Sequence, residues 1–195
     1  MRATEFIAEY RNTDDPALRK WFAGSKVVDK DRKPLIVYHG TLFNDEIKSF
    51  HDLSHFGTQG AANARIEDLL NLHPSARGYN QPSPGEEKPH IYPVYLKIVN
   101  PIQLPDLAEW HWSDMWMELI KTHEDEIGKL LKDDYGDEYE STWDMLDALQ
   151  TYDENPWEFL KSLGHDGVYY VNAHEDKGKI SWIPFSGKQV MSAFG

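Results

Sequence analysis

Short apolar runs alternate with polar segments along this chain, and their spacing predicts both strands and helices. Runs rich in β-branched and aromatic side chains between turn residues are typical of strands. The predicted strands are 27–28, 35–38, 91–99, 167–171 and 180–185. Apolar positions three or four residues apart predict helices over 16–22, 61–72, much of 106–149 and 156–163. The two kinds of element follow no regular alternation, which favours an α+β fold over a doubly wound sheet.

Capping and breaking residues set the ends of these elements. Asp15, followed by proline, starts the first helix, and Asn155, also followed by proline, starts the last one. Asn100–Pro101 ends the 91–99 strand, because proline brings no hydrogen-bond donor to the ladder. Proline, glycine, serine and asparagine dominate residues 73–89, which predicts an exposed loop there.

The charge of the chain is concentrated in one region. The chain has 195 residues, 40% of them hydrophobic, which suits one domain with a real core, and its formal net charge is −13. Much of the acid lies in 106–158, so we expect a single domain, 1–195, with an acidic helical insertion whose tryptophans anchor a core. Net negative charge argues against general nucleic-acid binding, which needs clustered Lys and Arg. It is compatible with a nucleotide in a local pocket or with a basic protein partner.

The sequence has no segment suited to a membrane or to export. No run approaches the ~20 apolar residues that span a bilayer, and charges are scattered through Met1 to Tyr10. Without cysteine there is no disulfide and no thiolate zinc site. Four histidines outside the helices share no metal-ligand spacing with nearby acids, and no metal site is expected: His51, His55, His73 and His90. We therefore expect a cytoplasmic protein without a membrane partner.

The strongest candidate for chemistry is Tyr38-His39-Gly40-Thr41, directly after the apolar run 34–37. Histidine offers a donor or acceptor that switches near neutral pH. Glycine lets a flat ligand approach the main chain, and the threonine adds a hydroxyl. A strand that ends in a cleft often has a functional role. A hydrogen-bonded structural histidine is the alternative, and the tetrapeptide alone does not decide between them.

Three blocks of sequence in a fixed order extend this observation. They are Val37–Thr41 with Phe50, His55–Thr58 and Ala61–Arg65, then Tyr92–Ile98 with Asn100–Ile102, then Leu163–Tyr170 with Ile180–Phe185 and Gln189–Ala193. In this order they resemble the ADP-ribosyltransferase-like domains of phage and mobile-element polyvalent proteins, relatives of the diphtheria-toxin and poly-ADP-ribose-polymerase branch. The resemblance covers about half of the chain and implies a split β-sheet core.

The resemblance also implies NAD as the co-substrate and gives residues their roles. In relatives the strand histidine bonds the adenosine-side ribose and the glycine backbone pairs with the nicotinamide amide, which implies these roles for His39 and Gly40, with Thr41 in support. Phe56 stands where relatives have a tyrosine that stacks on nicotinamide, and stacking needs only a π face. A core position is the alternative for Phe56. The expected NAD-binding residues are Tyr38, His39, Gly40, Thr41, Phe56, Gly57 and Thr58.

The acid expected from the resemblance is missing at its usual position. Active relatives have a glutamate just before the C-terminal apolar strand, where it supports the positive charge on the departing sugar, and this chain has Lys179 there. A lysine would repel that charge. Glu175, in the same loop, is our candidate replacement and joins His39 as a catalytic residue, with a solvated loop acid as the alternative. Gln189 is expected to be a structural or substrate-facing amide.

These features predict an NAD-dependent ADP-ribosyltransferase, chemically a glycosyltransferase, encoded by a phage or mobile element. It would modify a host macromolecule, with a host protein as the expected target, in the host cytoplasm. The alternative is a catalytically degenerate module of the same fold that binds NAD or another nucleotide, or blocks a basic partner as an inhibitor or anti-defence factor. Hydrolysis of NAD, with water as the acceptor, is a third hypothesis.

Overall fold

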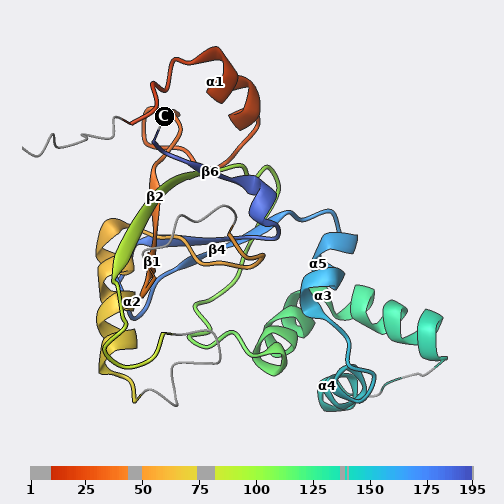
Figure 1. Ribbon diagram of the computed structural model, residues 1–195. Coiled ribbons are helices and arrows are strands. Elements are labelled where there is room, and N and C mark those ends of the chain that lie inside the picture. Colours follow the sequence, from red (N-terminus) through yellow and green to blue (C-terminus); the bar gives the residue numbers. More distant parts are fainter. Residues whose placement is uncertain (1–9, 44–49, 74–81, 137–138, 140, 195) are drawn as a thin grey trace, which may run out of the picture. The chain divides into compact units, whose positions relative to one another are not determined.

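A computed structural model describes residues 10–43, 50–73, 82–136, 139 and 141–194. The described residues form five α-helices and two three-stranded sheets, which confirms the α+β class (Figure 1). The predictions for residues 1–9 and for 74–81 of the 73–89 loop lie outside the described residues. Residues 82–89, the described end of that loop, contain no helix or strand.

The chain divides into two compact units. Unit 1 is Met1–Gln103 with Asp166–Gly195, and unit 2 is Leu104–His165. Unit 2 contains the whole acidic stretch 106–158 that the sequence marks. The organisation of 1–195 as a single domain stays a prediction.

The first sheet of unit 1 is antiparallel throughout, in the order β1-β2-β6. Its strands are β1 (Val37–Thr41), β2 (His90–Leu96) and β6 (Val190–Ser192). Helix α1 (Pro16–Phe22) is capped by the Asp15 side chain, as predicted, and packs Leu18 and Phe22 against Tyr95 of β2.

The second sheet of unit 1 has the order β3-β4-β5. Here β3 (Pro101–Gln103) pairs parallel with β4 (Gly167–Val171), which pairs antiparallel with β5 (Ile180–Pro184). The dipeptide Phe56–Gly57 joins the two sheets. Gly57 forms a bridge with Tyr38 of β1, and Phe56 forms a bridge with Trp182 of β5.

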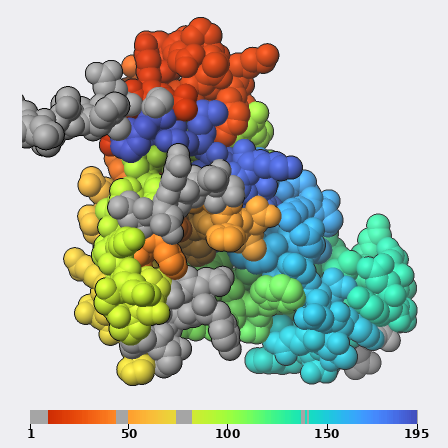
Figure 2. All heavy atoms as spheres, in the orientation of Figure 1, coloured from red at the N-terminus to blue at the C-terminus, as the bar shows by residue number. Residues whose placement is uncertain are grey.

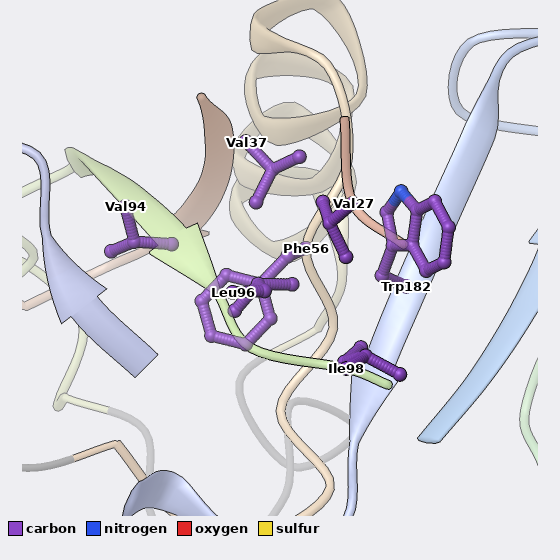
Figure 3. Close-up of a cluster of buried hydrophobic side chains, with 7 residues drawn as sticks. All are labelled: Val27, Val37, Phe56, Val94, Leu96, Ile98 and Trp182. Carbon is purple, nitrogen blue, oxygen red and sulfur yellow. The ribbon is translucent and has the colours of Figure 1, made fainter. Parts of the chain in front are cut away.

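The core of unit 1 lies where these segments meet. Seven buried side chains, from both sheets and from the loops between them, form one cluster (Figure 3): Val27, Val37, Phe56, Val94, Leu96, Ile98 and Trp182. Because the cluster draws on residues far apart in the sequence, it fixes the Phe56–Gly57 segment between the two sheets.

Helix α2 (Gln59–Asn71) packs closely against β1 (Figure 1). Thr58 caps the helix by accepting a hydrogen bond from the Ala61 N–H. A Cβ atom on Gly40 would lie 2.2 Å from the backbone oxygen of Ala62. This glycine is therefore required by the contact between a strand backbone and a helix backbone.

Three strand predictions need correction. The predicted 35–38 strand begins at Val37 as β1 and continues past His39 to Thr41 through its pairing with β2. The 91–99 strand ends at Leu96, because the following amides leave the ladder: Ile98 N–H donates to the Ser25 hydroxyl, and Val99 N–H and Asn100 N–H donate to the Asp166 carboxylate. Pro101, which was expected only to end a strand, is the first residue of β3. Because β3 is an edge strand, the missing N–H of proline is tolerated there. Residues 27–28 form no strand and contribute one isolated bridge, Val28 with Pro34.

Unit 2 is helical in its described residues. It contains α3 (Trp112–Tyr135), α4 (Thr142–Thr151) and α5 (Pro156–Ser162), and α3 has a kink at His123. Trp116 is buried, as predicted, and its indole N–H donates to the Glu154 carbonyl. Trp112 and Trp143 are 40% and 70% exposed, so the prediction of a core role is wrong for these two. Trp112 is the first residue of α3 and Trp143 the second residue of α4, so both lie in the first turn of a helix and stay exposed, three residues before the buried Met115 and Leu146.

Within the described residues, no helix has the length and apolar character needed to cross a membrane.

Replacing Gly40 with alanine is expected to destabilise unit 1 by about 2–3 kcal/mol, because the new methyl group meets a helix backbone that cannot move aside. The measurement is the free energy of unfolding in urea, followed by circular dichroism. Gly128→Ala in α3 is the matched control: its Cβ would meet only Met145 Cε at 3.5 Å, so it should be neutral or stabilise by up to about 1 kcal/mol. Equal unfolding free energies for Gly40→Ala and wild type would contradict the close β1–α2 contact.

Candidate functional site

Strand alternation places His39 on the face of the first sheet that holds Tyr92. Paired residues of an antiparallel ladder project from the same face, and His39 pairs with Tyr92 while Thr41 pairs with His90. Tyr38 and Gly40 belong to the opposite face, where Gly40 meets α2. His39 and Thr41 therefore belong to one face of the sheet, and Tyr38 and Gly40 belong to the face covered by α2.

The ring of His39 is held in one tautomer. Its Nδ1 lies 2.9 Å from the His55 carbonyl oxygen. A carbonyl only accepts, so Nδ1 is the protonated nitrogen and Nε2 of the neutral ring is an acceptor. Burial lowers the pKa of His39, the His55 carbonyl opposes this, and the positive charge of Arg65 lowers the pKa further. At neutral pH the ring can therefore accept a hydrogen bond from a hydroxyl through Nε2.

The backbone of Gly40 lies on an open edge of β1. Successive residues of an antiparallel strand point their N–H and C=O groups alternately toward and away from the partner strand. Tyr38 points away from β2, since it exchanges two hydrogen bonds with Gly57, of 2.8 and 3.0 Å, and faces Pro93, which has no N–H. Gly40, two residues later, points the same way. Among the described residues no backbone group pairs with it there, so a donor and an acceptor remain available side by side.

The side chains of Tyr38 and Phe56 are used by the fold. Burial and the neighbouring Tyr10 raise the pKa of Tyr38. Phe56 is 1% exposed, enclosed by the core cluster of Figure 3. The burial of Phe56 favours the core interpretation over the stacking role.

Two partly buried aromatic residues lie near His39, and the sequence analysis named both only as parts of the ordered blocks, without a role at the site. The Phe50 ring meets His39 edge to face, with centroids 5.5 Å apart, and Tyr92 lies 6.1 Å from Phe50. Segment 50–58, in orange, and β2, in yellow-green, are both visible on the face of unit 1 in Figure 2. The period-two alternation of 90–96 is a signal for Tyr92, but it identifies a neighbour of His39 only once the register with β1 is known.

The loop between β4 and β5 brings Glu175 to this part of unit 1. Buried Asn172 donates through Nδ2 to Glu175 Oε2 and to Ser181 Oγ, both at 3.2 Å. Ser181 lies against Gly57, where an added Cβ would be 2.7 Å from the Ser181 hydroxyl oxygen. The predicted acid is therefore linked, through two buried polar side chains, to the dipeptide that pairs with β1.

A second acid of the same loop contacts the predicted site directly. The Thr58 hydroxyl donates to Asp176 Oδ2 while accepting from the Ala61 N–H. A negative charge at the first turn of α2 is favourable, because unpaired N–H groups gather there. Thr58 thus caps α2 and holds the loop through Asp176, an acid of the same loop that the sequence analysis passed over in favour of Glu175.

Lys179 and Gln189 take structural places. The backbone of Lys179 closes the loop, with its carbonyl accepting from Asn172 N–H and its N–H donating to the Asp176 carbonyl, and its side chain is exposed. Gln189 donates to the carbonyls of Lys97 and Asp166 and accepts from Ser186 N–H. The structural interpretation of Gln189 therefore accounts for both ends of its amide. Thr41, also expected to assist, accepts from the Phe43 N–H.

Across the part of the chain that the structure describes, no group of three or more His, Cys, Asp or Glu side chains is arranged to hold a metal ion.

A family model described as ADP-ribosyltransferase in polyvalent proteins matches residues 29–195. The chain belongs to this family. The match covers most of the chain and includes the His39 strand, the Phe56–Thr58 segment and the Glu175 loop. No curated protein and no solved structure gives a significant match. The three ordered blocks therefore identified the family correctly, while the roles of individual residues rest on the geometry above.

The lowered pKa of His39 predicts that the protein loses stability in mild acid. The unfolded histidine binds a proton below pH about 6.5, whereas the folded ring resists protonation until a lower pH. In that window the unfolded state holds more protons, so the free energy of unfolding falls with pH, by up to about 1.4 kcal/mol per pH unit from this group.

Urea unfolding at pH 7.5, 6.5 and 5.5 measures the effect against His39→Gln, whose amide does not titrate. The wild type should lose more stability than the variant between pH 6.5 and 5.5. Parallel losses in the two proteins would show that His39 is not held neutral.

Proposed function

We propose that this protein binds NAD and transfers its ADP-ribose group to a host macromolecule. The observation that best supports the proposal is the arrangement of His39 and Gly40 in β1. A neutral imidazole acceptor stands next to a backbone donor and acceptor on an open strand edge. The acidic loop that contains Glu175 is tied to the segment that pairs with this strand.

The donors and acceptors of this arrangement fit the groups that NAD presents. The Nε2 lone pair of His39 suits a ribose hydroxyl, which is a donor. The N–H and C=O of Gly40 suit a primary carboxamide, which accepts and donates in the same plane. The rings of Phe50 and Tyr92 offer π faces near His39 for the nicotinamide. The Thr41 hydroxyl lies at the same end of β1 and supports this contact.

In the reaction, the C–N bond between ribose and nicotinamide breaks, and its electron pair leaves with nicotinamide, which departs neutral. A nucleophile of the acceptor forms the new bond to the same ribose carbon and gives up its proton. Positive charge grows on the sugar between these events, and a carboxylate nearby lowers the energy of that state. We assign this role to Glu175.

The architecture is consistent with this activity. We interpret the two three-stranded sheets as the split core of the ADP-ribosyltransferase fold, and unit 2 as an acidic helical insertion within one domain, 1–195. The joint between the sheets, at Phe56–Gly57, then lies beside the NAD site.

The charge distribution favours a basic protein as the acceptor. Residues 104–165 contain 17 acidic and 4 basic residues, a formal charge of −13, whereas the rest of the chain contains 16 of each and is neutral. A strongly acidic helical unit attracts a lysine- or arginine-rich surface and repels nucleic acid and anionic membranes. We propose a host protein target in the host cytoplasm, and a phage or mobile-element origin.

One observation favours a second candidate function. Lys179 stands where active relatives have a glutamate, so transfer depends on a replacement acid. If Glu175 does not serve, the protein is a degenerate member that binds NAD or another nucleotide, or occupies a basic partner through unit 2. Hydrolysis of NAD would instead give free ADP-ribose without labelled protein.

Replacing His39 with alanine should weaken NAD binding about tenfold, because one hydrogen bond to the ribose is lost. It should also lower the rate of labelling by at least about 100-fold, since the ribose is then poorly oriented. Calorimetry with NAD measures the first effect, and transfer from labelled NAD to a bacterial lysate measures the second.

His51→Ala is the matched control, since His51 is an exposed histidine of the same unit, and it should behave as wild type. Labelling by His39→Ala at the wild-type rate would refute the assignment. Binding of NAD by the wild type without nicotinamide release would support the degenerate candidate.

If unit 2 recognises a basic acceptor, salt should slow transfer to the protein target much more than it slows the reaction in which water is the acceptor. Raising KCl from about 50 to 300 mM should lower labelling of the target roughly tenfold, because ions screen the attraction between the proteins. Nicotinamide release with water as acceptor should change much less. Equal salt effects on both rates would argue against electrostatic recognition of the target.

A further inference from the structure

Asn172, at the start of the β4–β5 loop, is a buried polar residue whose side chain is fully bonded. It is 2% exposed. Its Oδ1 accepts from the N–H groups of His174 and Glu175, at 3.2 and 2.9 Å. Its Nδ2 donates to Glu175 Oε2 and Ser181 Oγ. Burying an amide is costly unless each group finds a partner, and here both ends do.

The turn explains only half of these contacts. Acceptance by Oδ1 from the next N–H groups is the usual Asx turn, and an aspartate would form it equally well. The Nδ2 donors are specific to an amide. One goes to Ser181, which lies against Gly57 beside β1, and the other goes to the Glu175 carboxylate. The amide thus joins Glu175 to the segment that supports the candidate site.

A single residue therefore holds both the backbone and the side chain of Glu175. The Glu175 N–H donates to Asn172 Oδ1, and the Glu175 carboxylate accepts from Asn172 Nδ2. Two contacts from one buried group restrict the main-chain position and the direction of the carboxylate together. The second acid of the loop, Asp176, is held by Thr58 and keeps the loop at the first turn of α2.

We propose that Asn172 is a positioning residue that aims the Glu175 carboxylate at the ribose of NAD. The inference rests on the proposed function, and it names the contact that lets a loop glutamate replace the acid missing at Lys179. Glu175 acts on the sugar, and Asn172 acts only through Glu175.

The test exchanges the donor and the acceptor in the hydrogen bond between Asn172 Nδ2 and Glu175 Oε2. In Asn172→Asp the turn acceptor is kept and the Ser181 hydroxyl can turn to donate to the new carboxylate, so the contact specifically lost is the one to Glu175, where two carboxylates now meet. In Glu175→Gln the amide oxygen still accepts from Asn172. In the double variant Asn172→Asp/Glu175→Gln the new amide donates to the new carboxylate, which restores the pair in the opposite direction.

Each variant has its own expected result. Asn172→Asp should lower the melting temperature by roughly 5–10 °C and kcat for nicotinamide release by about 100-fold, with KM for NAD changed less than about threefold. Glu175→Gln should keep its melting temperature and lose kcat by at least about 100-fold. The double variant should recover the melting temperature and stay inactive, because the carboxylate is on the wrong residue.

Leu18→Ala, in the buried cluster between α1 and Tyr95, is the control for a loss of stability alone. It should lower the melting temperature and leave kcat within about threefold of wild type. A loss of stability in Asn172→Asp with full kcat, or a double variant that does not recover stability, would overturn the proposal. If the wild type binds NAD but releases no nicotinamide, the proposed function fails, while the stability comparison still decides whether Asn172 holds Glu175.

Discussion

The pairing of Phe56–Gly57 with both sheets is the contact on which the rest of unit 1 depends. Gly57 exchanges backbone hydrogen bonds with Tyr38 of β1, and Phe56 does the same with Trp182 of β5. The Phe56 ring fills the core between them. An isolated three-stranded sheet has little core of its own, and this dipeptide lets two such sheets share one.

The same contact determines the geometry around His39. Because the chain pairs with Tyr38 and turns away at His55, the His55 carbonyl meets the imidazole and the edge beyond Tyr38 is left open at Gly40. Gly57, at the joint, leaves room for Ser181, which bonds Asn172 and so connects the acidic loop. The Phe56–Gly57 segment thus joins the two sheets and also borders the candidate ligand site on β1, which explains why many polar contacts lie around it.

The division of charge has a physical meaning of its own. All of the formal net charge belongs to residues 104–165, and the remaining chain is neutral. A neutral unit 1 does not repel the phosphates of a dinucleotide, whereas an acidic unit 2 would. Separation of the charge into a helical unit therefore allows one chain to combine an anionic co-substrate with a basic acceptor, the pairing that our proposed function requires.

Much of the local structure followed from the sequence, because short-range rules decide it. Asp15 and Asn155 cap helices where expected, and the period of apolar residues located α2 and β4. The exposed tryptophans of unit 2 were misjudged, since a helical period shows that a face exists and not how wide its buried part is. The end of β2 was missed because residues distant in sequence, Ser25 and Asp166, accept hydrogen bonds from the backbone N–H groups of residues 98–100.

The sequence by itself determined the α+β class and the family, because ordered motifs and local periods can be read from consecutive residues, and it made the His39–Gly40 strand the candidate site. Only the tertiary structure decided that Phe56 belongs to the core, that Gly40 is needed by α2, and that Asn172 and Asp176 hold the acidic loop. These facts depend on strand register and on contacts between segments more than 100 residues apart, such as Thr58 with Asp176. The spacing of neighbouring residues cannot predict such contacts, because they form only when distant segments of the chain meet in the folded structure.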